Sequence, residues 1–309
     1  MPIEKAKKIW MDGELVDWED AQVHVLTHAL HYGTGVFEGI RGYKTKKGTS
    51  VFRLTDHMRR LQRSARIIMM DLPFSLEELV EATKQTIRVN ELADFPLLYI
   101  RPLAYFGYGE FGLNPLGNPV KVSIAAFPWG TYLGEEGLSA GIRVKTTSWQ
   151  RIDMNAMPPQ AKSSAGYLNS VLAKIEVLKA GYDEALFINP QGTVAEGPGE
   201  NFFSVRDGVI VTPNRVTAGL AGITRDSVIT IAHDLGYEVR EEAIARADVY
   251  ISDEAFFTGT AAELTPIREL DDRVIGSGEP GPITKKLQET FFAAARGEIE
   301  TYREWNEYV

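Results

Sequence analysis

The chain has 309 residues, of which 44% are hydrophobic and 24% are charged, an ordinary composition for a globular protein. A formal net charge of −9 without any basic block argues against nucleic acids and anionic membrane surfaces as partners. There is no cysteine, which excludes disulfides and thiolate metal sites, and no apolar run approaches the roughly 18 residues of a bilayer span. We therefore expect a soluble, cytoplasmic protein.

The first part of the chain predicts strands around two adjacent helices. Asp12-Gly13, between short apolar stretches, predicts a tight hairpin turn. A helical apolar stripe follows and ends at about Met69, and Ser75 with Glu78 forms a capping-box pattern that begins a second helix. Residues 97–106 and 121–129 are rich in β-branched and aromatic side chains, which predicts two strands.

The glycine-rich residues 130–141 predict a linker. We therefore expect an N-terminal domain over residues 1–130, a linker over 131–140 and a C-terminal domain over 141–309. In the second domain, apolar residues at helical spacing predict a helix that Gly181 ends. Further helices are predicted over 224–235 and 282–296. Helices and strands in both halves indicate an α/β fold of two α+β domains.

Lys162 is the first candidate for chemistry. It follows Pro158-Pro159 and lies among small residues, so a flat ligand has room against its amine. Lysine amines form Schiff bases with carbonyl cofactors. The alternative is a solvated loop lysine, which is the more common role of a lysine.

Two turns and one acidic loop could serve such a cofactor. The stretch 219–225, GLAGITR, places glycines and a threonine at a helix start, which suits a phosphate, and the small-residue turn 258–262 could do the same. Glu196 and Glu200 lie on a glycine-rich turn, and a carboxylate there could pair with a ring nitrogen. The alternatives are an ordinary capped helix, a plain turn and an exposed acidic loop.

Arg101 lies inside an apolar strand, on the same face as Tyr99. An arginine there is costly unless it meets an anion, so Arg101 is a candidate for binding a carboxylate, with an internal salt bridge as the alternative. Arg60, on a predicted helix, is a further candidate, although without other context a solvated arginine is the favoured interpretation. The five histidines show no metal-ligand pairing, so no metal site is expected.

Eight motifs together resemble the class IV pyridoxal-phosphate aminotransferases, most closely the branched-chain amino acid aminotransferases. In the family's order, they read HALHYGTGVFEGIRGY, HMRRL, YIRPL, AAFPWGTYLG, AKSSAGYLNS, AEGPGENFF, GLAGITR and FTGTAAELTP. The resemblance implies the family's two-domain α/β fold, with pyridoxal 5'-phosphate in a cleft between the domains. It also implies amino-group transfer between L-leucine, L-isoleucine or L-valine and 2-oxoglutarate by a ping-pong Schiff-base mechanism.

The resemblance also implies a role for each matching residue. Lys162 would be the catalytic Schiff-base lysine and proton carrier, Glu196 the partner of the pyridine nitrogen, and Tyr167 a contact of the phenolic oxygen. Leu220 would pack on the ring. The expected phosphate ligands are Arg60, Ile223, Thr224 and Thr260. The expected substrate pocket is formed by Phe37, Tyr99, Arg101, Tyr132, Ala261 and Ala262, with Tyr32 reaching into the neighbouring subunit's site.

A homodimer, or a trimer of dimers, follows from the same resemblance. Three relatives of the superfamily stay open as alternatives, because they share the lysine, the glutamate and the phosphate turns: D-amino acid transaminase, (R)-amine transaminase and aminodeoxychorismate lyase. VFEGIRGY and YIRPL favour the branched-chain enzymes. A non-catalytic α/β binding protein is a further alternative. Ser163-Ser164-Ala165 replaces a glycine-richer run of many relatives, which could alter how freely Lys162 moves.

Overall fold

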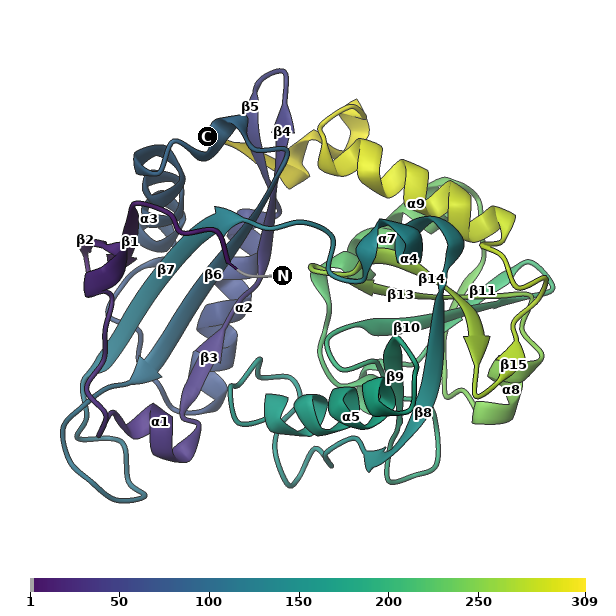
Figure 1. The fold of residues 1–309 in the computed structure, drawn as a ribbon, viewed down its shortest axis with the longest axis horizontal. Coiled ribbons are helices and arrows are strands. Elements are labelled where there is room, and N and C mark those ends of the chain that lie inside the picture. The colour runs from purple at the N-terminus through teal and green to yellow at the C-terminus, as the bar shows by residue number, and fades with distance from the viewer. Residues whose placement is uncertain (1–2) are drawn as a thin grey trace. The chain divides into compact units, whose positions relative to one another are not determined.

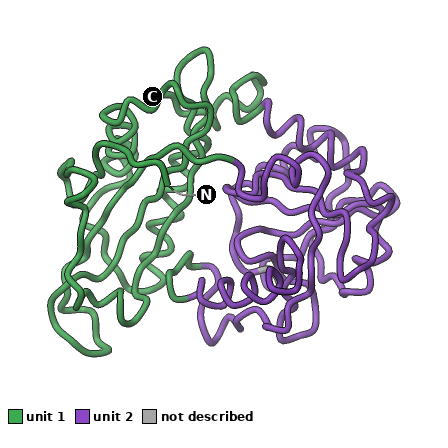
Figure 2. Tube along the Cα trace, in the orientation of Figure 1, with its two compact units in different colours: residues 1–130, 161–165, 294–309 green, residues 131–160, 166–293 purple. Residues whose placement is uncertain are grey.

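A computed structural model describes residues 3–309 of the chain, with the backbone only at 217 and 218. It divides into two compact units (Figure 2). The first unit comprises residues 1–130, 161–165 and 294–309, and the second comprises 131–160 and 166–293. Each unit contains helices and one large sheet of its own (Figure 1), in agreement with the predicted α/β class.

The sheet of the first unit is antiparallel throughout, in the order β16-β5-β4-β6-β7-β1-β2, with β3 beside β6. The core lies between this sheet and α2 and α3, whose side chains pack with those of the strands. The strands are β1 (Lys8–Met11), β2 (Glu14–Asp17), β3 (Gly35–Phe37), β4 (Ile40–Thr45), β5 (Gly48–Phe52), β6 (Leu97–Phe106), β7 (Val120–Pro128) and β16 (Asn306–Tyr308). The helices are α1 (His28–Tyr32), α2 (Leu54–Ile67) and α3 (Leu76–Val89), with short 3-10 helices at Trp18–Asp20, Leu92–Asp94 and Glu300–Trp305.

The sheet of the second unit is mixed, in the order β12-β11-β10-β13-β14-β8-β9, with β15 beside β14. β8 runs parallel to both of its neighbours, and β11 runs parallel to β12. The strands are β8 (Ile142–Gln150), β9 (Glu184–Ile188), β10 (Asn201–Arg206), β11 (Val209–Thr212), β12 (Val239–Glu241), β13 (Glu254–Gly259), β14 (Glu263–Leu270) and β15 (Arg273–Val274). The helices are α4 (Gly134–Ala140), α5 (Tyr167–Lys179), α6 (Arg215–Ala218), α7 (Ile223–Asp234), α8 (Arg246–Tyr250) and α9 (Pro282–Ala295).

Local sequence signals predicted several element boundaries correctly. Asp12 and Gly13 form the turn between β1 and β2, with both residues at positive φ. The capping box is complete, because the Glu78 N–H donates to Ser75 Oγ while the Ser75 N–H donates to the Glu78 carboxylate. The predicted strands at 97–106 and 121–129 are β6 and β7.

The structure differs from the predicted domain boundaries in three places. Residues 134–140 of the expected linker form helix α4. Residues 161–165 and 294–309, expected in the second domain, belong to the first unit. The reason is long-range strand pairing, since β16 pairs with β5 and Ser163 bridges Val36, and neither partner is signalled locally. None of the helices within residues 3–309 has the length and apolar character required to cross a bilayer.

Candidate active site

Lys162 lies in the first unit, beside the short strand β3. The Phe37 N–H donates to the Lys162 carbonyl at 3.0 Å, and the Lys162 N–H donates to Ser64 Oγ at 3.1 Å. The Lys162 Nζ lies 5.2 Å from the centre of the Phe37 ring. Close packing explains the small residues around it, because a side chain at Gly33 would press against Ala165. Lys162 is half-buried and held at its main chain, so it is not a solvated loop lysine.

Arg60 lies on α2 and makes a buried ion pair with Glu38, a residue that the sequence analysis did not single out. The Arg60 Nε donates to Glu38 Oε1 at 2.7 Å and the Nη2 donates to Oε2 at 2.8 Å. His57 Nδ1 lies 2.7 Å from the same Oε2. Arg60 is only 9% exposed and Glu38 is 0% exposed. Arg60 is therefore an oriented cation inside the first unit and not a solvated helix arginine.

The charges in this triad follow from its burial and its contacts. Burial alone would raise the pKa of Glu38, but the charge and hydrogen bonds of Arg60, aided by His57, hold that pKa well below its usual range. Burial lowers the pKa of His57, despite the opposing effect of Glu38. At neutral pH the triad thus consists of a carboxylate, a guanidinium and a neutral imidazole.

Phe37, Tyr99 and Arg101 come together in the first unit. The Arg101 Nη2 donates to the Tyr99 hydroxyl at 2.8 Å. The Arg101 guanidinium lies 4.6 Å from the Phe37 ring centre and 5.2 Å from that of Tyr99. Within residues 3–309, its buried Nε has no hydrogen-bond partner. These contacts contain no carboxylate for Arg101, so they do not support the internal salt bridge of the alternative interpretation.

Arg41 and Trp129 complete this aromatic group and were missed by the sequence analysis. The fully buried Arg41 donates from Nη1 to the Trp129 carbonyl at 2.6 Å and from Nη2 to the Gly130 carbonyl at 2.9 Å. The Trp129 ring lies 4.7 Å from the Tyr99 ring in an edge contact. Gly39 leaves the space that the Tyr99 hydroxyl occupies, because a side chain there would collide with it. Arg41 therefore fixes the end of β7 against Tyr99.

In the second unit, Glu196 is held on the turn before β10. It is 3% exposed and accepts from Arg151 Nε at 2.8 Å. The Leu220 N–H donates to it at 3.3 Å and Asn201 Nδ2 at 3.4 Å. Gly219 is at positive φ and lies so close that any side chain there would collide with the Glu196 carboxylate. Glu196 is therefore buried and oriented, and the exposed-loop interpretation is wrong for it.

The two predicted phosphate turns also belong to the second unit. Ile223 and Thr224 are buried in the first turn of α7, whose N-cap Gly222 offers no capping side chain. Thr260, Ala261 and Ala262 form the tight turn between β13 and β14. Just before it, Thr258 is 0% exposed, and its Oγ1 has no hydrogen-bond partner within residues 3–309.

The remaining predicted residues lie nearer the surface of their own units. Tyr167 is the first residue of α5 and is half-buried. Tyr132 is exposed, with Lys174 Nζ 5.2 Å from its ring centre. Tyr32 ends α1 in the first unit, and its ring lies 6.1 Å from that of Phe111.

Glu200 follows Glu196 on the same turn and is also buried, at 4% exposure. Burial, with the nearby charge of Glu184, raises the pKa of Glu200 to about 8. Burial also raises the pKa of Glu184, although Lys174 lies only 2.7 Å from that carboxylate and opposes the shift. Glu200 is therefore protonated at neutral pH.

Replacing Glu200 by glutamine should change how stability depends on pH. The unfolded chain releases this proton near pH 4.3, whereas the folded protein keeps it up to about pH 8. Protonated Glu200 thus adds its full contribution to the free energy of unfolding below about pH 4.3, and this contribution is lost as the pH rises through about 8. Glu200→Gln cannot ionise, so its free energy of unfolding should increase relative to wild type between about pH 5.5 and about pH 8.5. Urea unfolding over this range measures the difference, with exposed Glu279→Gln as the control; a constant difference would contradict the assignment.

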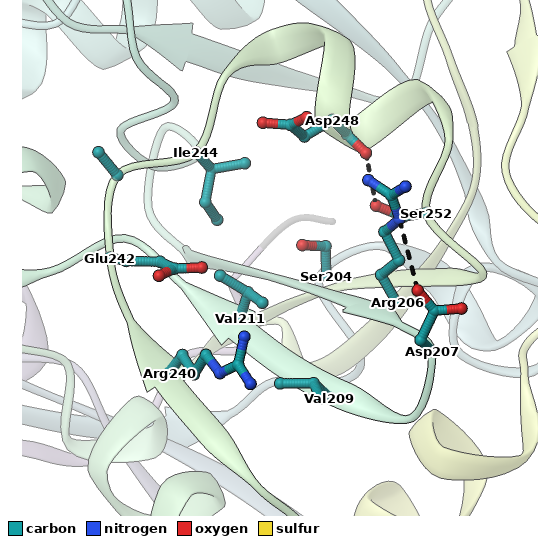
Figure 3. A pocket seen from close by; sticks show the side chains of 11 residues that line it. Ser204, Arg206, Asp207, Val209, Val211, Arg240, Glu242, Ile244, Asp248 and Ser252 are labelled. Atoms are coloured by element: carbon teal, nitrogen blue, oxygen red, sulfur yellow. Dashed lines mark hydrogen bonds and ion pairs between the residues drawn. The ribbon is translucent and has the colours of Figure 1, made fainter.

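Two of the cavities on the second unit are large enough to consider as ligand sites. The larger of these, of about 460 Å³, lies among β10, β11, β12 and α8 (Figure 3). Two arginines line it, and each has a carboxylate partner. The Arg206 Nε lies 3.8 Å from Asp207 Oδ2, and the Arg240 Nε lies 2.7 Å from Glu238 Oε1. No predicted site residue lines it. The smaller cavity, of about 280 Å³, borders the turn that carries Leu220 and is lined by Met154, Gln160, Arg215, Val216, Gly219, Leu220, Ala221 and Arg225.

Comparison with known proteins gives matches along the whole chain. The family described as amino-transferase class IV matches residues 35–270. The branched-chain-amino-acid aminotransferase of Pseudomonas aeruginosa is 51% identical, over 97% of each chain. The crystal structure of the Escherichia coli branched-chain amino acid aminotransferase is 47% identical with a TM-score of 0.95, over 98% of this chain and 99% of that one. The T.th. branched-chain amino acid aminotransferase, solved with pyridoxamine 5'-phosphate, is 50% identical with a TM-score of 0.94 and the same coverage.

Proposed function

Because the chain belongs to the class IV aminotransferases and, within them, to the branched-chain-amino-acid aminotransferases, we propose that it moves the amino group between L-leucine, L-isoleucine or L-valine and 2-oxoglutarate. It is a pyridoxal-phosphate-dependent enzyme, as class IV aminotransferases are. The observation that carries the substrate proposal is Arg101, a cation set among the apolar rings of Phe37 and Tyr99. A guanidinium beside two aromatic rings offers contacts both to an apolar side chain and to a distal carboxylate.

The side chains present fit pyridoxal phosphate. Glu196 is a buried carboxylate held by Arg151, which suits a protonated ring nitrogen. The start of α7, with Gly222 at its N-cap, is a glycine turn at a helix N-terminus, a local structure that suits a phosphate. The unpartnered Oγ1 of Thr258 lies in the strand that leads to Thr260. We propose that Arg60, Ile223, Thr224 and Thr260 hold the phosphate, that Tyr167 contacts the phenolic oxygen, and that Leu220 packs on the ring.

The cofactor, when bound, carries the amino group between the two substrates and accepts the electron pair left at the α-carbon. In this proposal the Lys162 amine binds the cofactor in the resting enzyme, takes the α-proton of the amino acid as general base, and returns a proton as general acid. Glu196 keeps the ring nitrogen protonated. The hydrogen bonds at the main chain of Lys162 keep the base of this lysine fixed while its amine moves.

Both substrate classes use one pocket in this proposal. Phe37, Tyr99 and Tyr132 supply apolar surface for leucine, isoleucine and valine. Arg101 supplies the cation for the distal carboxylate of glutamate or 2-oxoglutarate, and its buried Nε is a donor without a protein acceptor in residues 3–309. Ala261 and Ala262 offer their backbone at the β13–β14 turn.

Arg101→Ala should therefore weaken glutamate and 2-oxoglutarate far more than leucine. Losing a hydrogen bond to a charged group costs about 1.5–3 kcal/mol, or about 10- to 100-fold in kcat/KM. Steady-state kinetics with each substrate measures the ratio, and the control is Arg88→Ala, an exposed arginine of the first unit paired with Glu81. An equal loss for leucine and glutamate would rule out this role.

We also propose that the enzyme is a homodimer, or a trimer of dimers, and acts in the cytoplasm. The apolar stripe of α5 that the sequence indicated is exposed on the second unit, at Leu168, Val171, Ile175 and Leu178. In the first unit, Leu30 is exposed two residues before Tyr32, and the exposed Phe111 has its ring 6.1 Å from the Tyr32 ring. Exposed apolar surface of this kind supports association with a second copy, into whose site Tyr32 would reach.

The reaction can be tested with three separate mixtures. The purified enzyme is incubated with L-leucine, with D-alanine or with 2-oxoglutarate, and the absorption spectrum of the cofactor is followed. L-leucine should convert the cofactor to its amine form, whereas D-alanine alone and 2-oxoglutarate alone should leave the spectrum unchanged. 2-oxoglutarate added afterwards to the L-leucine mixture should reverse the change. Conversion by D-alanine in place of L-leucine would overturn the substrate assignment.

A further inference from the structure

Glu38 occupies an unusual place in the first unit. It follows β3 directly, it is fully buried, and it accepts hydrogen bonds from two side chains of α2. Its two oxygens accept the Nε and Nη2 of Arg60, so the guanidinium plane is fixed by two parallel bonds. His57 bonds to one of the same oxygens and fixes the carboxylate in turn. Arg60 therefore has only one orientation that keeps this set of bonds.

The segment that carries Glu38 also holds Lys162. The Phe37 N–H bonds to the Lys162 carbonyl, Val36 bridges Ser163, and the Ser164 N–H donates to the Gly35 carbonyl at 2.8 Å. The next residue, Glu38, is itself anchored, because its N–H donates to the Pro102 carbonyl of β6 at 2.9 Å. One short stretch of chain thus fixes the base of the lysine and the direction of the arginine.

We propose that Glu38 is the positioning residue for Arg60, so that the phosphate of the cofactor is recognised by a guanidinium whose orientation Glu38 sets. The inference rests on the proposed role of Arg60 as a phosphate ligand. Glu38 itself does not touch the cofactor. Its effect passes through Arg60 and should therefore appear only with a ligand that carries the phosphate.

The test compares the affinity of the full-length apoenzyme for pyridoxal phosphate and for pyridoxal, which lacks the phosphate. In Glu38→Gln an amide NH2 group, which cannot accept a hydrogen bond, replaces one carboxylate oxygen, so one of the two bonds to Arg60 is lost. Partners that orient metal ligands account for about 10- to 100-fold in affinity, and we expect the Kd of pyridoxal phosphate to rise by at least about 10-fold. The Kd of pyridoxal, measured by the absorption of the lysine-bound form, should not change.

Glu38→Asp is the second variant, because it keeps the charge but shortens the reach. It should also weaken the binding of pyridoxal phosphate and not that of pyridoxal, because the orientation of Arg60 depends on the position of the carboxylate as well as on its charge. The inference is overturned if both variants bind pyridoxal phosphate like the wild type, if Glu38→Asp does so while Glu38→Gln does not, or if both ligands weaken equally. If one of these two variants does not fold, the ratio of the two Kd values in the other variant decides the question.

Two further variants separate this inference from the proposed function. Arg60→Gln should weaken pyridoxal phosphate relative to pyridoxal, and if it does not, the assignment of Arg60 to the phosphate is wrong. If Arg60→Gln has the selective effect and the Glu38 variants lack it, only the inference about Glu38 fails. Arg59→Gln is the matched control, because Arg59 is the neighbouring helix residue, is exposed, and pairs with Asp56 at the surface.

Discussion

Lys162→Ala is expected to abolish transamination. The variant lacks the amine proposed to bind the cofactor and carry the α-proton, so kcat should fall by about 10⁴-fold or more. The visible absorption band of the lysine-bound cofactor should disappear at the same time. The backbone contacts of residue 162 do not involve its side chain, so the fold should persist. Absorption spectra and leucine-to-2-oxoglutarate kinetics measure both effects.

Lys46→Ala provides the control for Lys162→Ala, because Lys46 is an exposed lysine of the same unit. It should keep the wild-type spectrum and rate. Added small amines should restore part of the activity of Lys162→Ala if the missing function is proton transfer. A Lys162→Ala enzyme that retained both the band and the rate would overturn the central assignment.

Glu196→Gln is expected to lower kcat by about 10²- to 10³-fold, the cost of removing one preorganised electrostatic partner. A neutral amide cannot favour the protonated ring nitrogen, and it leaves Arg151 without its charge partner at 2.8 Å. The variant should still bind the cofactor, because Lys162 and the phosphate ligands are untouched. Single-turnover conversion of the cofactor by L-leucine measures the loss.

Glu200→Gln is the matched control for Glu196→Gln, because it makes the same chemical change at a second buried glutamate of the same turn. Glu200 is already protonated at neutral pH, so its variant should react at close to the wild-type rate there. Equal losses in the two variants would mean that the turn as a whole, and not the Glu196 carboxylate, is what the reaction requires.

Sequence reasoning succeeded where the signal was local. Asp12-Gly13 indicated the first hairpin because few residues tolerate positive φ at both turn positions, and Ser75 with Glu78 indicated a helix start because both partners lie within one turn. Lys162, Glu196 and the two small-residue turns were local candidates only, because small residues beside them leave room for a ligand, and their proposed roles came from the family resemblance.

The partners of these residues could not be found in the same way. Glu38 and Arg60 are 22 positions apart, and Glu196 and Arg151 are 45 positions apart, and no periodicity connects them. Trp129 lies at the end of β7, where it looked like any strand aromatic, and its contact with Tyr99 depends on the pairing of β6 with β7. The same limitation placed residues 294–309 in the wrong domain, because a three-residue strand has no pattern of its own.

The pairing of β16 with β5 has a consequence for biosynthesis. The Val309 N–H donates to the Thr49 carbonyl at 3.0 Å, so a segment that is translated late completes a sheet whose other strands are translated early. Until residues 306–309 have been made, β5 is an open edge, and open edges invite pairing with other chains. A nascent or truncated polypeptide that lacks them therefore exposes an aggregation-prone strand in the same unit that holds Lys162.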